Sequence, residues 1–284
     1  MPATDRQTSD RQNTADHSST PPTPDRGAAD VSPAWSKAEL ARPHANQQKA
    51  DKVRRMFAAI APSYDLNNRL HSLWLDQSWR KTAVRIAGVK PNDHVLDVAC
   101  GTGDLTQAFA KSGAARVVGA DFTAEMLDQA RAKQAKLEPN CARKIEYLQA
   151  DAMALPFADQ SFDIVSIAFG IRNVAEPARA IAEFHRVLRP NGRLVILEFD
   201  QPSFAIGRWI NRLYCARIMP LTATMISRDT SGAYKYLPAS VGTFMSRGEM
   251  LQALREAGFT SAECRSLTMG ICACYRAVRP VSGR

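Results

Sequence analysis

Short apolar runs alternate with helical segments between residues 94 and 199, and this alternation limits the fold more than any other feature of the sequence. Each run is apolar along its length instead of at every second position, which is typical of strands covered on both faces. Repeated strand–helix units predict an α/β fold with a mostly parallel sheet and helices on both faces. The predicted strands are His94–Ala99, Arg116–Ala120, Ile145–Gln149, Ile164–Phe169 and Leu194–Phe199. The predicted helices are Leu105–Lys111, Ala124–Leu137, Pro177–Leu188 and Arg247–Ala257.

Two further strands are predicted near the end of the chain, at Glu263–Leu267 and Ile271–Ala277. Only Thr268-Met269-Gly270 separates them, and a connection this short joins antiparallel neighbours. The predicted sheet therefore has seven strands, with an antiparallel strand at its C-terminal end.

The residues before the first strand divide into two kinds of sequence. Residues 1–50 are rich in Pro, Ser, Thr, Asp, Gln and Ala and nearly lack large aliphatic side chains, so we expect a disordered tail. Residues 51–90 predict a helical cap, and residues 51–284 as a whole predict one domain. The cap combines a helix with apolar side chains at Val53, Met56, Phe57 and Ile60 and a second helix over Leu70–Ala87.

The formal net charge of +9 indicates an anionic partner or surface. Residues 1–50 carry six acidic and six basic side chains, so the whole excess lies in residues 51–284. A basic excess suits nucleic acid, lipid headgroups or an acidic substrate. The sequence has no Lys/Arg run interleaved with aromatics, no helix-turn-helix and no RNA-binding signature, so nucleic acid is not the expected partner.

Several classes of protein are disfavoured by missing features. No apolar window of about 18 residues occurs, so we expect no transmembrane helix. The first 30 residues lack the apolar core of a secretory signal, so we expect a cytoplasmic protein. The six cysteines are scattered and have no histidines at zinc-site spacing, so we expect no metal.

A glycine turn follows the first predicted strand. Gly101 and Gly103 allow a tight turn and a close approach of a ligand to the backbone, although such turns are often only structural. Asp121 ends the next strand about 20 residues later, where a carboxylate can accept both ribose hydroxyls of a nucleoside. Asp151 and Ala152 follow the third strand, in a position suited to the adenine edge.

The acids around this turn favour a cationic ligand over a dinucleotide. Thr106 occupies the position where a dinucleotide fingerprint has its third glycine. Asp97 and Asp104 flank the turn, and carboxylates there repel a pyrophosphate. S-adenosylmethionine (SAM) has an ammonium, a sulfonium and no phosphate, so the electrostatics favour SAM.

Leu96–Asp104 resembles motif I of the class I SAM-dependent methyltransferases. Four other segments resemble signatures of the UbiE/MenG family, the C-methyltransferases of ubiquinone and menaquinone biosynthesis. The resemblance covers residues 51–279 and implies a Rossmann-like class I methyltransferase fold. The four segments are Tyr64–Lys81, Phe169–Val174, Arg186–Phe199 and Tyr234–Ser240.

The sequence departs from the family pattern at a few positions. Asn67, His71 and Trp74 stand where the family usually has an apolar residue, an apolar residue and Gly. Asp76 stands where many ubiquinone-pathway members have His, and Asn191 replaces the first Gly of a Pro-Gly-Gly turn. The changes in the first signature leave the identity of the quinone open.

The resemblance implies a set of cofactor-binding residues. Asp121 would hold the ribose, and Asp151 with the Ala152 amide would bind adenine. Thr102, with the backbone of its two flanking glycines, would hold the methionine end. The predicted SAM site therefore comprises Asp97, Gly101, Thr102, Gly103, Asp121, Asp151 and Ala152, with no metal.

The resemblance also implies methylation of a ring carbon of a polyprenylated quinol. Demethylmenaquinol is the preferred acceptor, partly because of Asp76; a ubiquinone-pathway quinol and another small hydrophobic acceptor are the alternatives. Arg172 would stabilise the phenolate, or form only a salt bridge. Asn173 would lie beside the reactive end of the cofactor, and Tyr64 would close over the site. Tyr234 and Tyr236 would hydrogen-bond the quinol oxygens, or would only pack in the lid. His71 and His185 are alternative bases.

Residues 203–243 are predicted to form a lid over the site. Phe204–Arg228 contains four arginines and no acid, and its apolar residues fit an amphipathic helix broken at Pro220. Such a helix would lie on anionic lipid at the inner face of the membrane, or would pack on the sheet with solvated arginines. The sequence leaves homodimerisation open.

Overall fold

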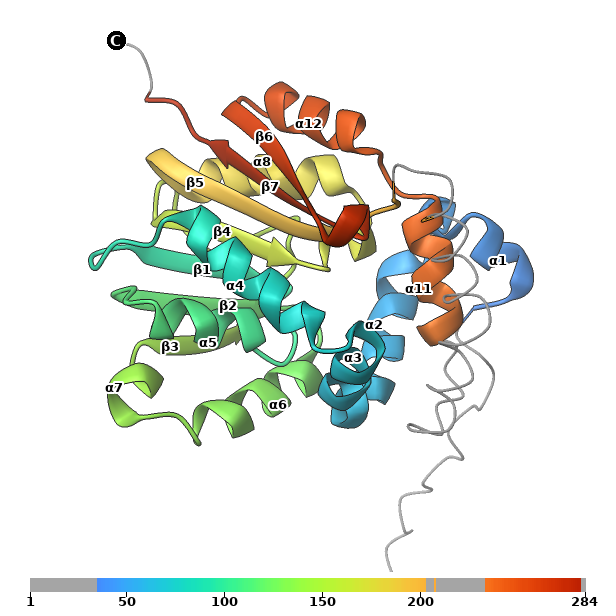
Figure 1. The fold of residues 1–284 in the computed structure, drawn as a ribbon, viewed down its shortest axis with the longest axis horizontal. Helices are drawn as coiled ribbons and strands as arrows, with labels where there is room; N and C mark the ends of the chain where they lie inside the picture. Colours follow the sequence, from blue (N-terminus) through green and yellow to red (C-terminus); the bar gives the residue numbers. More distant parts are fainter. Residues whose placement is uncertain (1–34, 203–206, 208–232, 282–284) are drawn as a thin grey trace, which may run out of the picture. The chain divides into compact units, whose positions relative to one another are not determined.

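The computed structural model describes residues 35–202, 207 and 233–281. These residues contain a seven-stranded sheet with the order β3-β2-β1-β4-β5-β7-β6 (Figure 1). The strands β1 to β5 are parallel, and β7 runs antiparallel between β5 and β6. The predicted mostly parallel sheet with an antiparallel C-terminal strand is therefore confirmed. The strands are β1 His94–Val98, β2 Arg116–Asp121, β3 Ile145–Gln149, β4 Phe162–Ala168, β5 Leu188–Phe199, β6 Thr260–Leu267 and β7 Cys272–Val278.

Helices cover both faces of the sheet, because both faces of the parallel strands are apolar. Trp79 of α4 and Phe109 of α5 belong to the hydrophobic core on one face. Phe184 of α8 and Leu254 of α12 belong to the core on the other face. These helices are α4 Leu75–Ala87, α5 Asp104–Lys111, α8 Pro177–Val187 and α12 Arg247–Glu256, while α6 Ala124–Gln134 and α7 Pro139–Ala142 connect β2 to β3.

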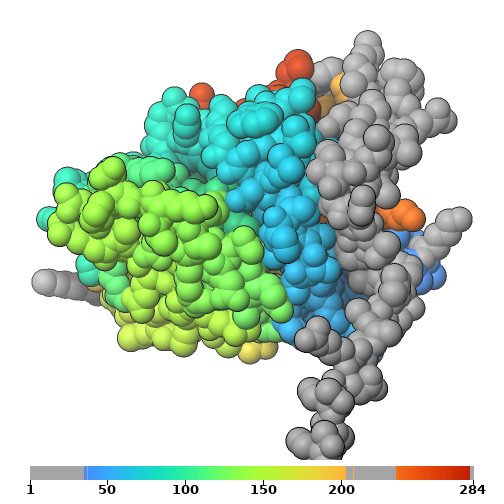
Figure 2. Space-filling model, turned by 90° about the horizontal axis from the view of Figure 1, so that it is seen from below, coloured from blue at the N-terminus to red at the C-terminus, as the bar shows by residue number. Residues whose placement is uncertain are grey.

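Several short helices lie beyond the carboxyl ends of the parallel strands (Figure 1). Helix α2 contacts α6, and in Figure 2 the blue N-terminal helices lie against the green residues that follow β2. Helix α11 contacts both α1 and α2. We call this group the cap; its helices are α1 Lys37–Ala41, η1 Pro43–Ala45, α2 Lys49–Ile60, η2 Ala61–Ser63, α3 Tyr64–Ser72 and α11 Ala233–Gly242.

Residues 35–50 differ from the disordered tail that composition predicted. The Trp35 ring stacks on the Tyr236 ring with 4.6 Å between centroids. The Lys49 amine donates a hydrogen bond to the Val174 carbonyl at 2.6 Å. These partners lie far along the chain, so no local window of composition contains the contacts that order the segment.

Two predicted segments lie partly outside the described residues. Residues 1–34 of the predicted tail lie outside the described residues, and so do residues 203–206 and 208–232 of the predicted lid. Within the part of the chain that the structure describes, no helix has the length and hydropathy that a membrane span requires.

The prediction of one helix over Leu70–Ala87 is wrong. Helix α3 ends at Ser72 and α4 begins at Leu75, because Leu73 and Trp74 have left-handed φ values of 51° and 63°. The apolar pattern runs through this break without interruption, so the periodicity gives no sign of it. The break leaves α3 in the cap while α4 packs on the sheet.

The turns that follow β1 and β4 touch each other at the carboxyl ends of these two strands. Ala99 and Phe169 have φ values of 50° and 57°, which are unfavourable for residues with a Cβ atom. A Cβ atom on Gly170 would lie 2.6 Å from the Ala99 Cβ. The close approach of the two turns therefore requires glycine at position 170.

We expect Gly170→Ala to lower the free energy of unfolding by about 1–3 kcal/mol, because the added methyl group overpacks the contact with Ala99. Ala99→Gly in the same chain should recover part of the loss, since it removes the nearer methyl group. Urea unfolding followed by circular dichroism measures both effects. Gly248→Ala is the control, because the added Cβ would meet no atom closer than 4.0 Å. Wild-type stability of Gly170→Ala would show that the turns separate freely.

Candidate active site

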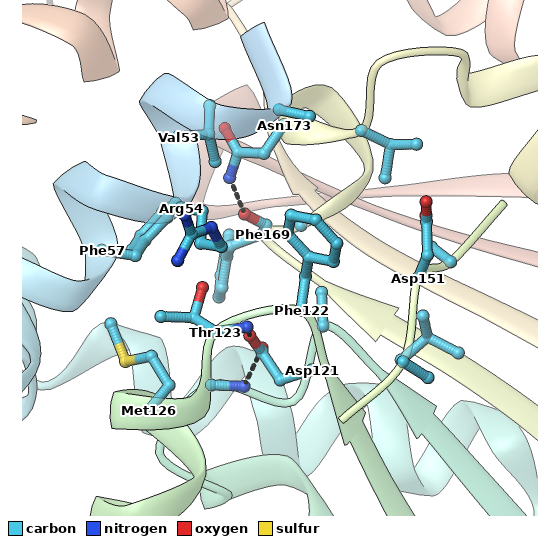
Figure 3. A pocket seen from close by; sticks show the side chains of 18 of the residues that line it. Val53, Arg54, Phe57, Asp121, Phe122, Thr123, Met126, Asp151, Phe169 and Asn173 are labelled. Carbon is cyan, nitrogen blue, oxygen red and sulfur yellow. Dashed lines mark hydrogen bonds between the residues drawn. The ribbon is translucent and has the colours of Figure 1, made fainter. Parts of the chain in front are cut away.

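A cavity lies between the carboxyl ends of β1, β2 and β4 and helix α2 (Figure 3). It spans about 810 Å³, open space at its mouth included. Asp121 and Asp151 contribute its acidic groups, and Phe57, Phe122 and Phe169 contribute aromatic walls. The cavity therefore has a polar end suited to a nucleoside and an apolar side suited to a ring.

A smaller cavity adjoins the first one above the glycine turn. Tyr64, Ala99, Gly101 and Ala168 line both cavities. The smaller cavity adds Arg80, Asp97, Cys100, Thr102, Asp104 and Leu105 to its walls. The two cavities together follow the carboxyl ends of the central strands, where ligands bind in open α/β sheets.

Asp121 ends β2 with its carboxylate held at the floor of the larger cavity (Figure 3). Its two oxygens accept hydrogen bonds from the backbone N–H groups of Gly101 and Thr123, each at 2.8 Å. Burial raises the pKa of this carboxyl group, and the hydrogen bonds oppose that shift. Among the described residues no cation pairs with it, so the carboxylate is fixed but not neutralised.

Asp97 is a second buried carboxylate without a cationic partner among the described residues. It is 1% exposed and accepts hydrogen bonds from the hydroxyl groups of Thr106 and Ser166, each at 2.7 Å. Burial raises its pKa to about 6 despite these hydrogen bonds. A bound cation next to Asp97 would offset the cost of burying its charge.

Asp104 differs from the expectation that it attracts a cationic ligand. Its carboxylate binds Arg69 at 2.9 Å and forms an ion pair with Lys133 as well. Burial raises its pKa, but the neighbouring cations outweigh this effect and lower it to about 2. The attraction for a cationic ligand therefore rests on Asp97 and Asp121.

The glycine turn is held by contacts from both sides. The Thr102 hydroxyl donates a hydrogen bond to Asp65 at 2.6 Å and lines the smaller cavity. A Cβ atom on Gly103 would lie 2.2 Å from the Tyr147 hydroxyl oxygen, and the φ of Gly103 is 82°. A side chain at position 103 is therefore excluded, and the turn can pass close to a ligand.

The structure brings the predicted cofactor residues together. Asp151 and Ala152 follow β3 and line the larger cavity, and the Asp151 carboxylate accepts the N–H of Met153 at 2.9 Å. Of the seven predicted residues, only Gly103 lines neither cavity. Two uncompensated carboxylates, an apolar wall and a glycine turn fit a nucleoside with a cationic tail, as SAM has.

Arg172 is placed differently from the expected phenolate-stabilising group. It is 5% exposed and lines neither cavity. Its Nη1 donates hydrogen bonds to the Glu198 carboxylate at 2.5 Å and to the Phe169 carbonyl at 2.8 Å. The guanidinium also packs against the Phe199 ring. The salt bridge that the sequence left as the alternative is therefore present, and it is buried.

Asn173 and Tyr64 line the larger cavity, and their catalytic roles stay predictions. The Asn173 amide donates to the Phe169 carbonyl at 3.2 Å (Figure 3), and its oxygen accepts the Tyr236 hydroxyl at 3.1 Å. Tyr236 is 1% exposed and lies behind Asn173, outside the cavity wall. Tyr234 belongs to α11, but its side chain lies outside the described part of the structure.

The two histidines considered as bases are not at the cavities. His71 and His185 line neither of them. The His185 ring packs edge-on against Phe259 instead. The described residues also contain no group of three or more His, Cys, Asp or Glu side chains arranged around a metal position.

Sequence reasoning missed the contribution of α2 to the cavity. Val53, Arg54 and Phe57 line it, and the Arg54 guanidinium extends into it (Figure 3). Arg54 is half-buried and has no ion pair with another described residue. The apolar repeat in α2 indicated a buried face, but a repeat does not tell which part of the chain that face meets.

A buried lysine supports the cavity from behind. Lys49 is 2% exposed, and its amine donates to the Val174 carbonyl and contacts the His44 Nδ1 at 3.1 Å. The His44 Nε2 donates in turn to the Ser240 carbonyl at 2.9 Å. Burial lowers the pKa of Lys49 to about 8. No local pattern in residues 1–50 indicated this contact.

Solved structures share this fold at low sequence identity. A chain of the complex between the Haloferax volcanii Trm112 methyltransferase activator and a putative methyltransferase aligns with a TM-score of 0.59 and 19% identity, covering 79% of this chain and 98% of its own. A SAM-dependent methyltransferase from Thermotoga maritima aligns with a TM-score of 0.56 and 18% identity, covering 80% and 99%. The fold is thus that of the SAM-dependent methyltransferases.

Curated relatives and a family model match most of the sequence. The demethylmenaquinone methyltransferase of Thermus thermophilus is 44% identical over 228 residues, which are 79% of this chain and 100% of the relative. The ubiquinone/menaquinone biosynthesis C-methyltransferase UbiE of Citrifermentans bemidjiense is 41% identical over 234 residues, which are 82% and 98%. The family model matches residues 45–279, and the chain therefore belongs to the ubiE/COQ5 methyltransferase family.

Proposed function

We propose that this enzyme transfers the methyl group of SAM to a ring carbon of a demethylated polyprenyl quinol. The observation that carries the proposal is the single cavity in which Asp121 and Asp151 adjoin the aromatic walls of Phe57 and Phe169. Such a cavity suits a nucleoside at one end and an apolar ring at the other. The names of the relatives at about 40% identity support a quinol as the acceptor.

The residues around the glycine turn would hold the cofactor. SAM, when bound, supplies an electrophilic methyl group on a sulfonium. Asp121 would accept the ribose hydroxyls, and Asp151 with the Ala152 amide would bind adenine. The Thr102 hydroxyl and the backbone of Gly101 and Gly103 would hold the methionine end, with the Asp97 carboxylate attracting its positive charge.

Side chains of the cap and of the turn after β4 would orient the acceptor ring. Phe57 and Phe169 offer apolar faces on which a quinol ring can stack. The Asn173 amide and the Tyr64 hydroxyl provide polar groups for a ring oxygen, and burial raises the pKa of Tyr64, so its hydroxyl keeps its proton. Arg54 supplies a positive charge for the developing phenolate. Carbon, methyl and sulfur would thus be aligned mainly by positioning.

The menaquinone-type ring is our preferred acceptor, and the ubiquinone-type ring remains the alternative. The preference rests on Asp76, which is 4% exposed and binds Arg80 at 2.9 Å. Arg80 lines the smaller cavity, so Asp76 acts on the site through Arg80. A polyprenyl tail dissolves in lipid, so this function places the enzyme at a membrane surface while it works.

The full chain incubated with SAM and reduced demethylmenaquinol should give the ring-methylated product, identified by mass spectrometry. A ubiquinone-type demethylated quinol and a panel of small hydrophobic phenols are assayed in parallel. We expect the menaquinone-type quinol to have the highest kcat/KM. Methylation of a panel phenol but of neither quinol would contradict the proposed substrate, and absence of SAM binding would contradict the proposed cofactor site.

SAM binding should weaken as the pH falls, because Asp97 loses its charge near its pKa of about 6. We expect the Kd measured by calorimetry to rise roughly tenfold from pH 7.5 to pH 5. Asp97→Asn should bind weakly at pH 7.5 and lose the pH dependence that titration of Asp97 causes. Asp128→Asn, an exposed acid on α6, should behave as wild type. An unchanged pH dependence in Asp97→Asn would exclude its role.

Arg172 should act as a positioning residue through Glu198 and the Phe169 turn. We expect Arg172→Lys and Glu198→Gln each to lower kcat roughly tenfold, because the first removes the guanidinium nitrogen that binds both Glu198 and the Phe169 carbonyl and the second removes the charge that holds that nitrogen in place. The KM for SAM should stay close to wild type. Thermal unfolding verifies that both variants fold, and Arg131→Ala, from an exposed ion pair, is the control. A wild-type kcat in Glu198→Gln would indicate that Arg172 acts independently of Glu198.

A further inference from the structure

The junction of α3 and α4 exposes an unusual amount of apolar side chain. Soluble proteins rarely leave such side chains contiguous, and groups of this kind mark interaction surfaces. We call these residues the α3–α4 corner. They are Leu66 (54% exposed), Leu70 (36%), Leu73 (78%), Trp74 (56%) and Leu75 (36%).

Helix α3 turns its apolar face to solvent, whereas a helix that packs on a core buries that face. Leu66 and Leu70 lie one helical turn apart on one face of α3, and that face points to solvent; Leu73, directly after the end of the helix, is exposed as well. Asn67, which is 0% exposed, lies on the inward side. The three leucines therefore stay exposed in the fold that the described residues form. An apolar phase outside the protein would cover them.

The backbone at the corner keeps two apolar side chains outward. Leu73 and Trp74 both have left-handed φ values, which cost about 1–2 kcal/mol for a residue with a Cβ atom. Glycine would relieve this strain at either position. The protein instead holds a leucine and a tryptophan at the tip, and tryptophan is enriched where membranes meet water.

The charges around the corner fit an anionic surface. Lys81 and Arg85 lie on the exposed face of α4 beyond Leu75, and neither forms an ion pair with another described residue. The two acids between residues 64 and 87 are both paired with cations: Asp65 with Lys133 and Asp76 with Arg80. These two cations lie about 9 and 15 Å along the α4 axis from Leu75, and they are free to attract anionic headgroups beside the corner.

The corner lies one short helix away from the active site. Tyr64, the first residue of α3, lines both cavities. Helix α3 has nine residues, so its axis is about 13 Å long. Contact of the corner with a bilayer would therefore bring the Tyr64 side of the cavity close to the lipid.

We propose that the α3–α4 corner inserts into the headgroup region of a bilayer that contains anionic lipid. Leu73 and Trp74 enter the apolar boundary, while Lys81 and Arg85 contact the headgroups. The corner thereby docks the enzyme where a polyprenylated acceptor is dissolved. This last step rests on the proposed function, whereas docking itself does not.

Sedimentation of the full chain with vesicles tests docking directly. We expect binding to vesicles of phosphatidylglycerol and phosphatidylethanolamine, weaker binding at high salt, and little binding to pure phosphatidylcholine. Leu73→Ser/Trp74→Ser should lower the partition coefficient roughly tenfold. Val281→Ser is the control. Val281 is 60% exposed, but it follows β7 at the end of the sheet that faces away from the cap. Equal partitioning of the double variant and wild type would overturn the proposal.

Quenching of tryptophan fluorescence by brominated lipid identifies the inserting segment. Trp35 and Trp79 are 3% and 4% exposed, so they contribute little to quenching. We expect quenching to fall in Trp74→Phe and to persist in Trp209→Phe. The opposite result would assign insertion to the predicted amphipathic segment Phe204–Arg228, which contains Trp209, and would contradict insertion of the corner. Analytical ultracentrifugation without lipid measures whether the chain forms a dimer. If wild type forms a dimer and Leu73→Ser/Trp74→Ser does not, the corner is a dimer interface, and the proposed membrane docking is contradicted.

Activity assays separate failure of docking from failure of the proposed function. With quinol embedded in vesicles, Leu73→Ser/Trp74→Ser should raise the apparent KM for quinol about tenfold. With a short-chain quinol in solution, the same variant should match wild type. Equal loss on both substrates would mean that the corner acts on the cavity and not on the membrane. Absence of methylation by wild type on either substrate would contradict the proposed function, while the sedimentation result would still decide docking.

Discussion

The ion pair between Arg172 and Glu198 fixes the turn on which the cavity depends. The same guanidinium nitrogen that binds Glu198 also donates to the Phe169 carbonyl. That carbonyl accepts the Asn173 amide, and Asn173 in turn accepts the Tyr236 hydroxyl. A continuous chain of hydrogen bonds thus links the end of β5 to α11 in the cap. Because the pair is buried, removal of either partner leaves an uncompensated charge that water does not reach.

The selectivity of the cavity follows from which carboxylates are neutralised. Asp65 and Asp104 lie beside the glycine turn, but they share Lys133 and Arg69 and so contribute little net charge. Asp97 and Asp121 have only hydroxyl and backbone N–H partners. In a medium of low dielectric constant, these two carboxylates favour a ligand with positive charge and disfavour a pyrophosphate. The ligand class is therefore set by the arrangement of partners and not by the number of acids.

The sequence predicted the sheet well because the central parallel strands β1 and β4 are short apolar runs, although the outer strand β3 has exposed Glu146 and Gln149. Six of the seven residues expected to bind the cofactor line the cavities, since the carboxyl ends of parallel strands meet at one end of the sheet. Their role as ligands stays a prediction. The sequence failed where the outcome depends on distant contacts. The arginine at position 172 could face the cavity or the neighbouring strand, and only packing against Glu198 decides between them. The break at Leu73 and Trp74 and the role of Arg54 were missed because a hydrophobic repeat does not specify the partner of a helix face.

The contact between His44 and Ser240 joins positions 196 residues apart. During synthesis, the five parallel strands leave the ribosome before α11 does, and domains generally begin to fold from the N-terminal side. Contacts of such long sequence separation also form slowly, because the intervening chain must be ordered first. We therefore expect the cavity walls, which come from residues 50–175, to form before α11 packs against the cap. The nascent protein passes through a stage in which α1 and α2 lack their contacts with α11, and only release of the last fifth of the chain fixes these helices over the cofactor site.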